Sequence, residues 1–132
     1  MAALSAYMQK ATLDWMYGGA TPTRPAAWGV GLSTGVPSST SASEIGTASG
    51  YARATVVMPA AASPAGTVQN TASMSFGPFS TAATISGIQT WDTMLSAGSG
   101  NMIEYGTLAT ARTVGVGDSL VIASAALTAL MT

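Results

Sequence analysis

The hydrophobic positions near the start of the chain recur with the period of an α-helix, which predicts a helix over residues 3–17. Gly18 and Gly19 follow, and glycine accepts the left-handed backbone conformation that ends many helices. The apolar face of this helix either docks on a neighbouring subunit or packs on the core of its own domain. The face consists of Leu4, Tyr7, Met8, Ala11 and Trp15.

Beyond residue 25 the period of the hydrophobic positions changes to two, which is typical of a β-strand. Trp28, Val30 and Leu32 alternate with small residues over residues 27–33 and predict a strand with one buried face. The glycines between them leave the other face bare. That face indicates either the close approach of another backbone or a bulge in the strand.

The rest of the chain predicts short strands separated by turns and loops. Residues 34–50 are rich in Ser, Thr and Gly and predict a long loop, which either reaches a neighbouring subunit or is a mobile surface loop. Residues 96–101 predict a hairpin turn, and Gly117-Asp118 predicts a tight turn. The last segment has the alanine content of a helix, but its Leu-Val-Ile start favours one or two strands. The predicted strands are residues 51–57, 67–76, 83–95, 102–108 and 120–131.

One helix followed by six or seven short strands predicts a mainly β fold. We expect a single β-sandwich or jelly-roll-like domain with a short N-terminal helix. The length of 132 residues fits one domain. Residues 1–19 are predicted to form an N-terminal helix or arm, and residues 20–132 the β-sandwich domain.

Charged residues are scarce, at 7% of the chain against roughly 25% in ordinary soluble domains. A small monomer normally needs a more strongly charged surface than this to stay in solution. We therefore expect other subunits to cover much of the surface, the alternative being a monomer whose surface is hydrated by Ser and Thr. The predicted interface residues are Leu4, Tyr7, Met8, Trp15, Pro37, Ile45, Leu130 and Met131.

The composition excludes several classes of function. Without cysteine or histidine there is no disulfide, thiolate metal site, imidazole base or Ser-His-Asp triad. Four scattered Lys and Arg residues do not form a nucleic-acid-binding patch. The apolar residues 120–131 are too few for a membrane-spanning helix, which needs about 20. No signal peptide is recognisable, so we expect synthesis and assembly in a cytoplasm, with no nucleic acid or membrane as partner.

The carboxylates offer little chemistry. Asp92 and Glu104 flank the predicted hairpin turn, and paired carboxylates can hydrolyse glycosides, but that reaction needs a sugar-binding cleft. We expect instead that Asp92 caps the turn and that Glu104 pairs with a cation such as Arg112. Asp118 is expected in a turn rather than on a calcium ion, because no closely spaced series of acidic residues accompanies it. The chain is therefore predicted to be non-enzymatic, with no catalytic residue, metal or cofactor.

Several short motifs follow one another in a specific order. With these motifs the chain resembles, over nearly its whole length, a family of small virion proteins of tailed phages known as phage tail fiber proteins. Its Ser- and Thr-rich long loop and residues 88–95 depart from the family pattern. The motifs are the helix end at residues 13–19, the Leu-Ser-Thr strand at 28–34, Gly-Tyr-Ala-Arg at 50–53, the strand at 70–76, Trp-Asp at 91–92, Tyr-Gly-Thr-Leu at 105–108 and Thr-Val-Gly-Val-Gly-Asp-Ser-Leu at 113–120.

The resemblance implies a non-enzymatic structural protein of a bacteriophage virion. A compact domain without long repeats favours a capsid cement or decoration protein, a homotrimer that binds the major capsid protein across capsomers on the outer head. The alternative is a tail or tail-fibre-associated protein, in which Trp28, Tyr51 and Trp91 either contact a host receptor or pack in the core. A glycan-degrading module is a third possibility, which the carboxylate analysis disfavours.

Overall fold

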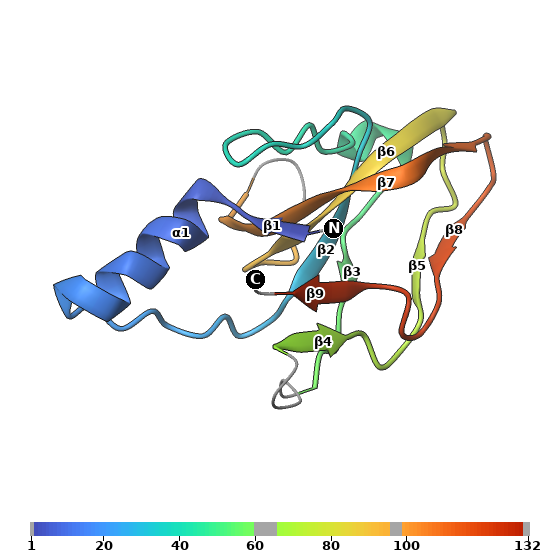
Figure 1. Ribbon diagram of the computed structural model, residues 1–132. Helices are drawn as coiled ribbons and strands as arrows, with labels where there is room; N and C mark the ends of the chain where they lie inside the picture. Colours follow the sequence, from blue (N-terminus) through green and yellow to red (C-terminus); the bar gives the residue numbers. More distant parts are fainter. Residues whose placement is uncertain (1, 60–65, 96–98, 131–132) are drawn as a thin grey trace.

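The computed structural model describes residues 2–59, 66–95 and 99–130. It confirms a mainly β fold with a short N-terminal helix (Figure 1). The main antiparallel sheet has the order β1-β7-β6-β2-β3, and two antiparallel ribbons accompany it, β4 with β9 and β5 with β8. The strands are β1 (Ala2–Leu4), β2 (Gly29–Ser33), β3 (Ala54–Thr55), β4 (Thr67–Gln69), β5 (Met74–Phe76), β6 (Ala83–Trp91), β7 (Met102–Val114), β8 (Leu120–Ile122) and β9 (Thr128–Leu130).

The hydrophobic core lies between the main sheet and the β5–β8 ribbon. Leu32 and Ile85 come from the main sheet, and Phe76 comes from the ribbon. All three side chains are at most 1% exposed. Two layers that share one core are the arrangement of a β-sandwich.

The helix begins later than the sequence predicts. Residues 2–4 form β1, which pairs with Gly106, Tyr105 and Glu104 of β7, so the predicted start at residue 3 is wrong. Ser5 ends this strand and caps the helix, because its Oγ accepts a hydrogen bond from the Met8 amide at 3.1 Å. Apolar residue 4 therefore belongs to the sheet, since a long-range strand pair outweighs the local helical pattern.

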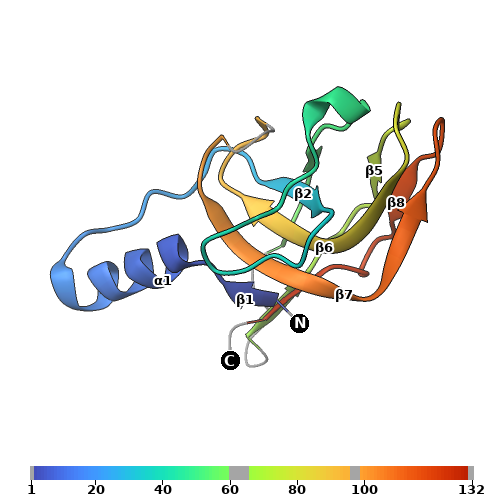
Figure 2. The ribbon, with the colours of Figure 1, turned by 90° about the horizontal axis from the view of Figure 1, so that it is seen from above.

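The N-terminal helix projects from the β domain. It consists of α1 (Ala6–Leu13) and one π-helical turn, η1 (Asp14–Gly18), and ends at Gly19, whose φ of 79° confirms the predicted glycine cap. None of the residues of α1 or η1 is buried. We call residues 6–19 the helical arm. Figures 1 and 2 both place it at one end of the molecule and β8 at the other.

Strand β2 is buried on both faces, which corrects the prediction of one buried face. Its pairing with β6 is continuous from Gly29 to Ser33, so the strand contains no bulge. The glycines instead allow close approaches. A Cβ atom on Gly29 would lie 2.5 Å from the Thr93 carbonyl oxygen, and one on Gly31 would lie 2.9 Å from Trp91 Nε1.

The long loop at residues 34–50 packs on its own domain and contains a short 3-10 turn, η2 (Thr47–Ser49). Ile45 is 4% exposed and belongs to the hydrophobic core. Pro37 is also buried, close to Gly87 of β6. Both predicted alternatives, an extended arm and a mobile loop, are wrong for these two positions.

The later strands follow the predicted order with different bounds. The single strand predicted at residues 67–76 is wrong, because Asn70 interrupts it. The Asn70 side chain donates hydrogen bonds to the carbonyl oxygens of Ala72 and Ala123, at 2.7 and 2.9 Å, and accepts one from the Leu127 amide at 2.8 Å. The β6–β7 pairing across the hairpin, the Asp118 turn and two C-terminal strands are confirmed.

Candidate functional site

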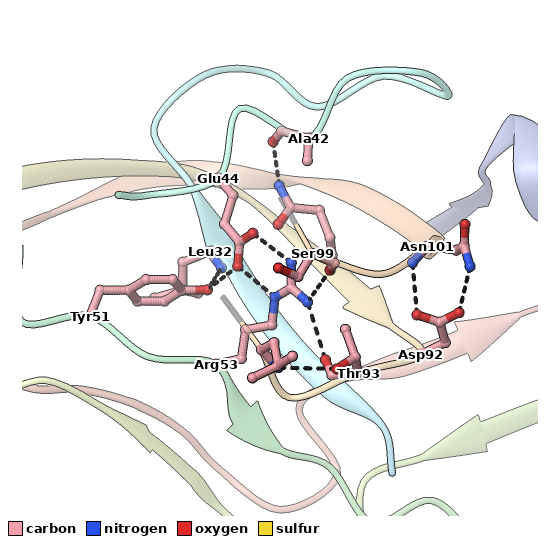
Figure 3. A network of polar contacts seen from close by, with 11 residues as sticks. Leu32, Ala42, Glu44, Tyr51, Arg53, Asp92, Thr93, Ser99 and Asn101 are labelled. Atoms are coloured by element: carbon pink, nitrogen blue, oxygen red, sulfur yellow. Dashed lines mark hydrogen bonds and ion pairs between the residues drawn. The ribbon is translucent and has the colours of Figure 1, made fainter. Parts of the chain in front are cut away.

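A buried ion pair joins the long loop to the main sheet (Figure 3). Arg53 Nη2 lies 2.7 Å from Glu44 Oε2, and Arg53 Nε donates to Glu44 Oε1 at 2.7 Å. Both side chains are withdrawn from water, with exposed fractions of 0% for Arg53 and 5% for Glu44. Arg53 Nη1 also donates to the carbonyl oxygens of Thr93 and Ser99. This two-bond geometry is the strong form of the Arg–carboxylate interaction.

Two aromatic residues complete this cluster. The Tyr51 hydroxyl donates to Glu44 Oε1 at 3.0 Å and accepts from the Leu32 amide at 2.9 Å. Burial, and then the charge of Glu44, raise the pKa of the Tyr51 hydroxyl. The Arg53 guanidinium lies 3.8 Å from the centre of the Trp91 ring. The cluster therefore holds the fold together and presents no open surface.

The three aromatic residues considered as receptor contacts pack in the domain. Tyr51 and Trp91 are buried, and the half-buried Trp28 packs against the core. The alternative of core packing is therefore the one the structure shows. The sequence motif Gly-Tyr-Ala-Arg marks Tyr51 and Arg53, but nothing in the sequence pairs them with Glu44 in a Ser- and Thr-rich loop.

We predict that Tyr51→Phe lowers the free energy of unfolding by about 1–3 kcal/mol. The substitution keeps the aromatic ring that stacks on Phe76, with ring centres 6.3 Å apart. It leaves the buried Leu32 amide without its acceptor and removes one of the two hydrogen bonds to Glu44 Oε1, the other coming from Arg53 Nε. Urea denaturation measures the loss. Tyr17→Phe at an exposed position serves as the control, and an equally small change in both variants would contradict the prediction.

The two carboxylates beside the hairpin have separate roles. Asp92 accepts hydrogen bonds from the Asn101 backbone amide and side-chain Nδ2, both at 2.7 Å, which confirms that it caps the turn. Glu104 does not pair with Arg112, so that prediction is wrong. Glu104 lies opposite Thr90 near the start of β7, whereas Arg112 lies opposite Ile85 near its end. Over the described parts of the chain, no group of acidic residues could hold a metal ion.

Burial raises the pKa of Glu104 above its ordinary value of 4.5. The folded protein therefore holds this proton at a higher pH than the unfolded chain does, and stability falls as the pH rises above 4.5. We predict that Glu104→Gln melts at a higher temperature than the parent protein at pH 7, with a difference that shrinks as the pH approaches 4. Thermal melts across this range test the prediction, and a difference independent of pH would contradict it.

The helical arm carries the largest concentration of exposed apolar side chains. Leu13, Trp15 and Met16 are between 56% and 59% exposed, and Tyr17 is 81% exposed. Three of these were missed by the sequence analysis, because they lie off the apolar face that the helical period defined. The sequence feature that could have identified them is their concentration in the last helical turn before Gly18 and Gly19.

The predicted interface residues fall into different environments. Tyr7 and Trp15 are exposed on the helical arm, and Leu4 and Met8 are half-buried near its base. Pro37 and Ile45 are buried in the domain, as described above. Of the two C-terminal positions, Met131 and the side chain of Leu130 lie outside the described residues.

An apolar groove of about 710 Å³ lies between β7 and the segment that contains β8 and β9. Most of its wall comes from residues 106–128, and Leu32 and Ile88 of the main sheet complete it. No helix in the described parts of the chain has the length and apolar character to cross a membrane. The groove is lined mainly by Leu32, Ile88, Leu108, Leu120, Ile122 and Leu127, with Arg112 also in its wall.

Comparison with known proteins agrees with the resemblance drawn from the motifs. A search of curated proteins finds no match. A family model described as "Podophage GP4 fiber I protein gp80" matches residues 3–129, which is nearly the whole chain. The match includes both the helical arm and the β domain that frames the groove. This chain therefore belongs to the podophage GP4 fiber I protein gp80 family and is a phage tail fiber-type structural protein of the virion.

Proposed function

We propose that the protein is a non-enzymatic subunit associated with the tail fibres, which acts by binding another subunit of the phage particle through its helical arm. The match to a fibre family over residues 3–129 carries the proposal. The match favours a fibre-associated role over the cement role. The cement role, with the major capsid protein as partner, was suggested by the absence of long repeats.

The surface of the helical arm supports a binding role. Its four large apolar side chains at residues 13, 15, 16 and 17 are more than half exposed on one short projecting segment. Such groups rarely gather on the free surface of a monomer, and a partner that covers them removes apolar area from water. The buried Glu44–Arg53 cluster, by contrast, has no open side on which a substrate could bind.

The copy number of the protein in purified particles tests the fibre-associated role. Quantitative mass spectrometry against the major capsid protein should give a few to a few tens of copies, as for a component of the tail. Hundreds of copies, close to the number of capsid subunits, would overturn this role and favour the cement role on the head.

The binding role of the arm has a separate test in infected cells that supply a variant protein from a plasmid. We expect Trp15→Ser, Met16→Ser and Tyr17→Ser together to prevent incorporation into particles. The matched control changes three exposed valines away from the arm. Equal incorporation of both variants would overturn the proposal. The control substitutions are Val36→Ser, Val57→Ser and Val116→Ser.

A further inference from the structure

The core of the β domain is open along one side. Leu32 at the bottom of the groove is 1% exposed, but the apolar side chains of its walls are only partly buried. A closed sandwich would cover these side chains with a further element. The groove therefore offers a partner apolar surface that is continuous with the core. The partly buried wall residues are Ile88, Leu108, Leu120, Ile122 and Leu127.

The backbone of β7 is also incompletely paired on the side of the groove. Its register with β6 jumps from Thr107 opposite Gly87 to Arg112 opposite Ile85. Strand β1 ends its pairing with β7 at Gly106. Among the described residues, those at 108–111 therefore form a bulge in β7 opposite Ser86 of β6, and β1 does not cover them.

We propose that this groove binds the helical arm of a second copy of the same chain. The inference rests on the proposed function, in which the arm binds another subunit, and it names that subunit. The apolar side chains of Trp15, Met16 and Tyr17 would fill the groove and cover its partly buried walls. Each chain thus carries one apolar projection and one apolar recess.

Charge at the two surfaces supports this pairing. Arg112 lines the groove, is exposed, and belongs to neither ion pair of the described residues. Asp14 lies on the arm directly before Trp15, where it pairs with Lys10 on the surface. Docking of the arm would bring the carboxylate of Asp14 towards the guanidinium of Arg112, which favours one orientation of the arm.

The arm does not reach the groove of its own chain. Figures 1 and 2 both show the arm and β8 at opposite ends. The base of the arm is fixed, because the Ser5 amide donates to the Ile103 carbonyl at 2.9 Å and the Ser5 hydroxyl donates to the Met102 carbonyl. A contact between copies is therefore head-to-tail, and such contacts either close into a ring or continue as a filament.

The absence of cysteine from the chain makes a direct cross-linking test possible. Purified Tyr17→Cys on the arm is mixed with purified Ala109→Cys on β7 and oxidised. We expect disulfide-linked heterodimers on a non-reducing gel. The matched control mixes Tyr17→Cys with Thr55→Cys, an exposed position on β3 at the far edge of the sheet. A heterodimer yield no greater than that of the control would overturn the inference.

Charge reversal gives a second, independent measurement. Asp14→Arg alone and Arg112→Glu alone should each weaken self-association about tenfold, measured by light scattering across protein concentrations, because each places like charges together. The two substitutions in one chain should restore it. A parent protein that stays monomeric, or singles that associate as the parent does, would overturn the inference. Loss of the serine-substituted arm variant from particles would then still support the proposed function with a different partner.

Discussion

Replacing Arg53 by alanine is expected to lower the free energy of unfolding by about 3–5 kcal/mol. The substitution leaves the Glu44 carboxylate buried without its cation, and also removes the contact with the Trp91 ring. Since domains of this size are stable by only about 5–15 kcal/mol, much of the protein would be close to unfolding. Urea denaturation followed by tryptophan fluorescence measures the change.

Two further variants show whether the unpaired charge of Glu44 causes the loss of stability in Arg53→Ala. Glu44→Gln together with Arg53→Met removes both charges and should recover part of the loss, because the desolvated carboxylate is gone. Lys10→Ala breaks the exposed pair with Asp14 and should cost no more than about 0.5 kcal/mol. A double variant as unstable as Arg53→Ala would contradict this account of the cluster.

Replacing Phe76 by alanine is expected to lower the free energy of unfolding by about 3–5 kcal/mol. Phe76 is 1% exposed on β5, packs between the two layers of the core and stacks on Tyr51. Its removal leaves a cavity that the paired strands around it cannot fill. Urea denaturation at neutral pH gives the loss, with Val57→Ala at an exposed position as the control. A loss below about 1 kcal/mol would show that the site collapses around the smaller side chain.

Local patterns predicted much of the fold. The two glycines after the helix and the turn at Asp118 are each determined by a few neighbouring residues, and both are confirmed. The pairing of β6 with β7 is confirmed as well, but residues 96–98 of the predicted hairpin turn lie outside the described residues. The alternation around Val30 located β2 but not the burial of its second face. That burial depends on Glu44 and Arg53, which arrive from other parts of the chain.

Two of the features missing from the predictions depend on distant partners. Residues 2–4 continue the apolar pattern of a helix but pair with β7, about a hundred positions later in the chain. Glu44 stands in a segment with the composition of a loop, and only the folded domain brings it to Arg53. The groove is mostly lined by the consecutive strands β7 and β8 and the segment after them, with Leu32 and Ile88 added from the main sheet. Periodicity reports which face of an element is apolar, but it does not report what covers that face.

Because β1 pairs with β7, the helical arm takes its orientation only after β7 has been synthesised. Ser5, at the base of the helical arm, is held by the backbone of Met102 and Ile103, so the arm has no fixed direction until most of the chain has left the ribosome. Contacts between residues so far apart in sequence require the closure of a long loop, whose entropic cost slows their formation. A prematurely terminated chain would lack this anchorage. The arm is thus presented in its folded orientation only by chains that have been completed through β7, and incomplete products would not compete for assembly.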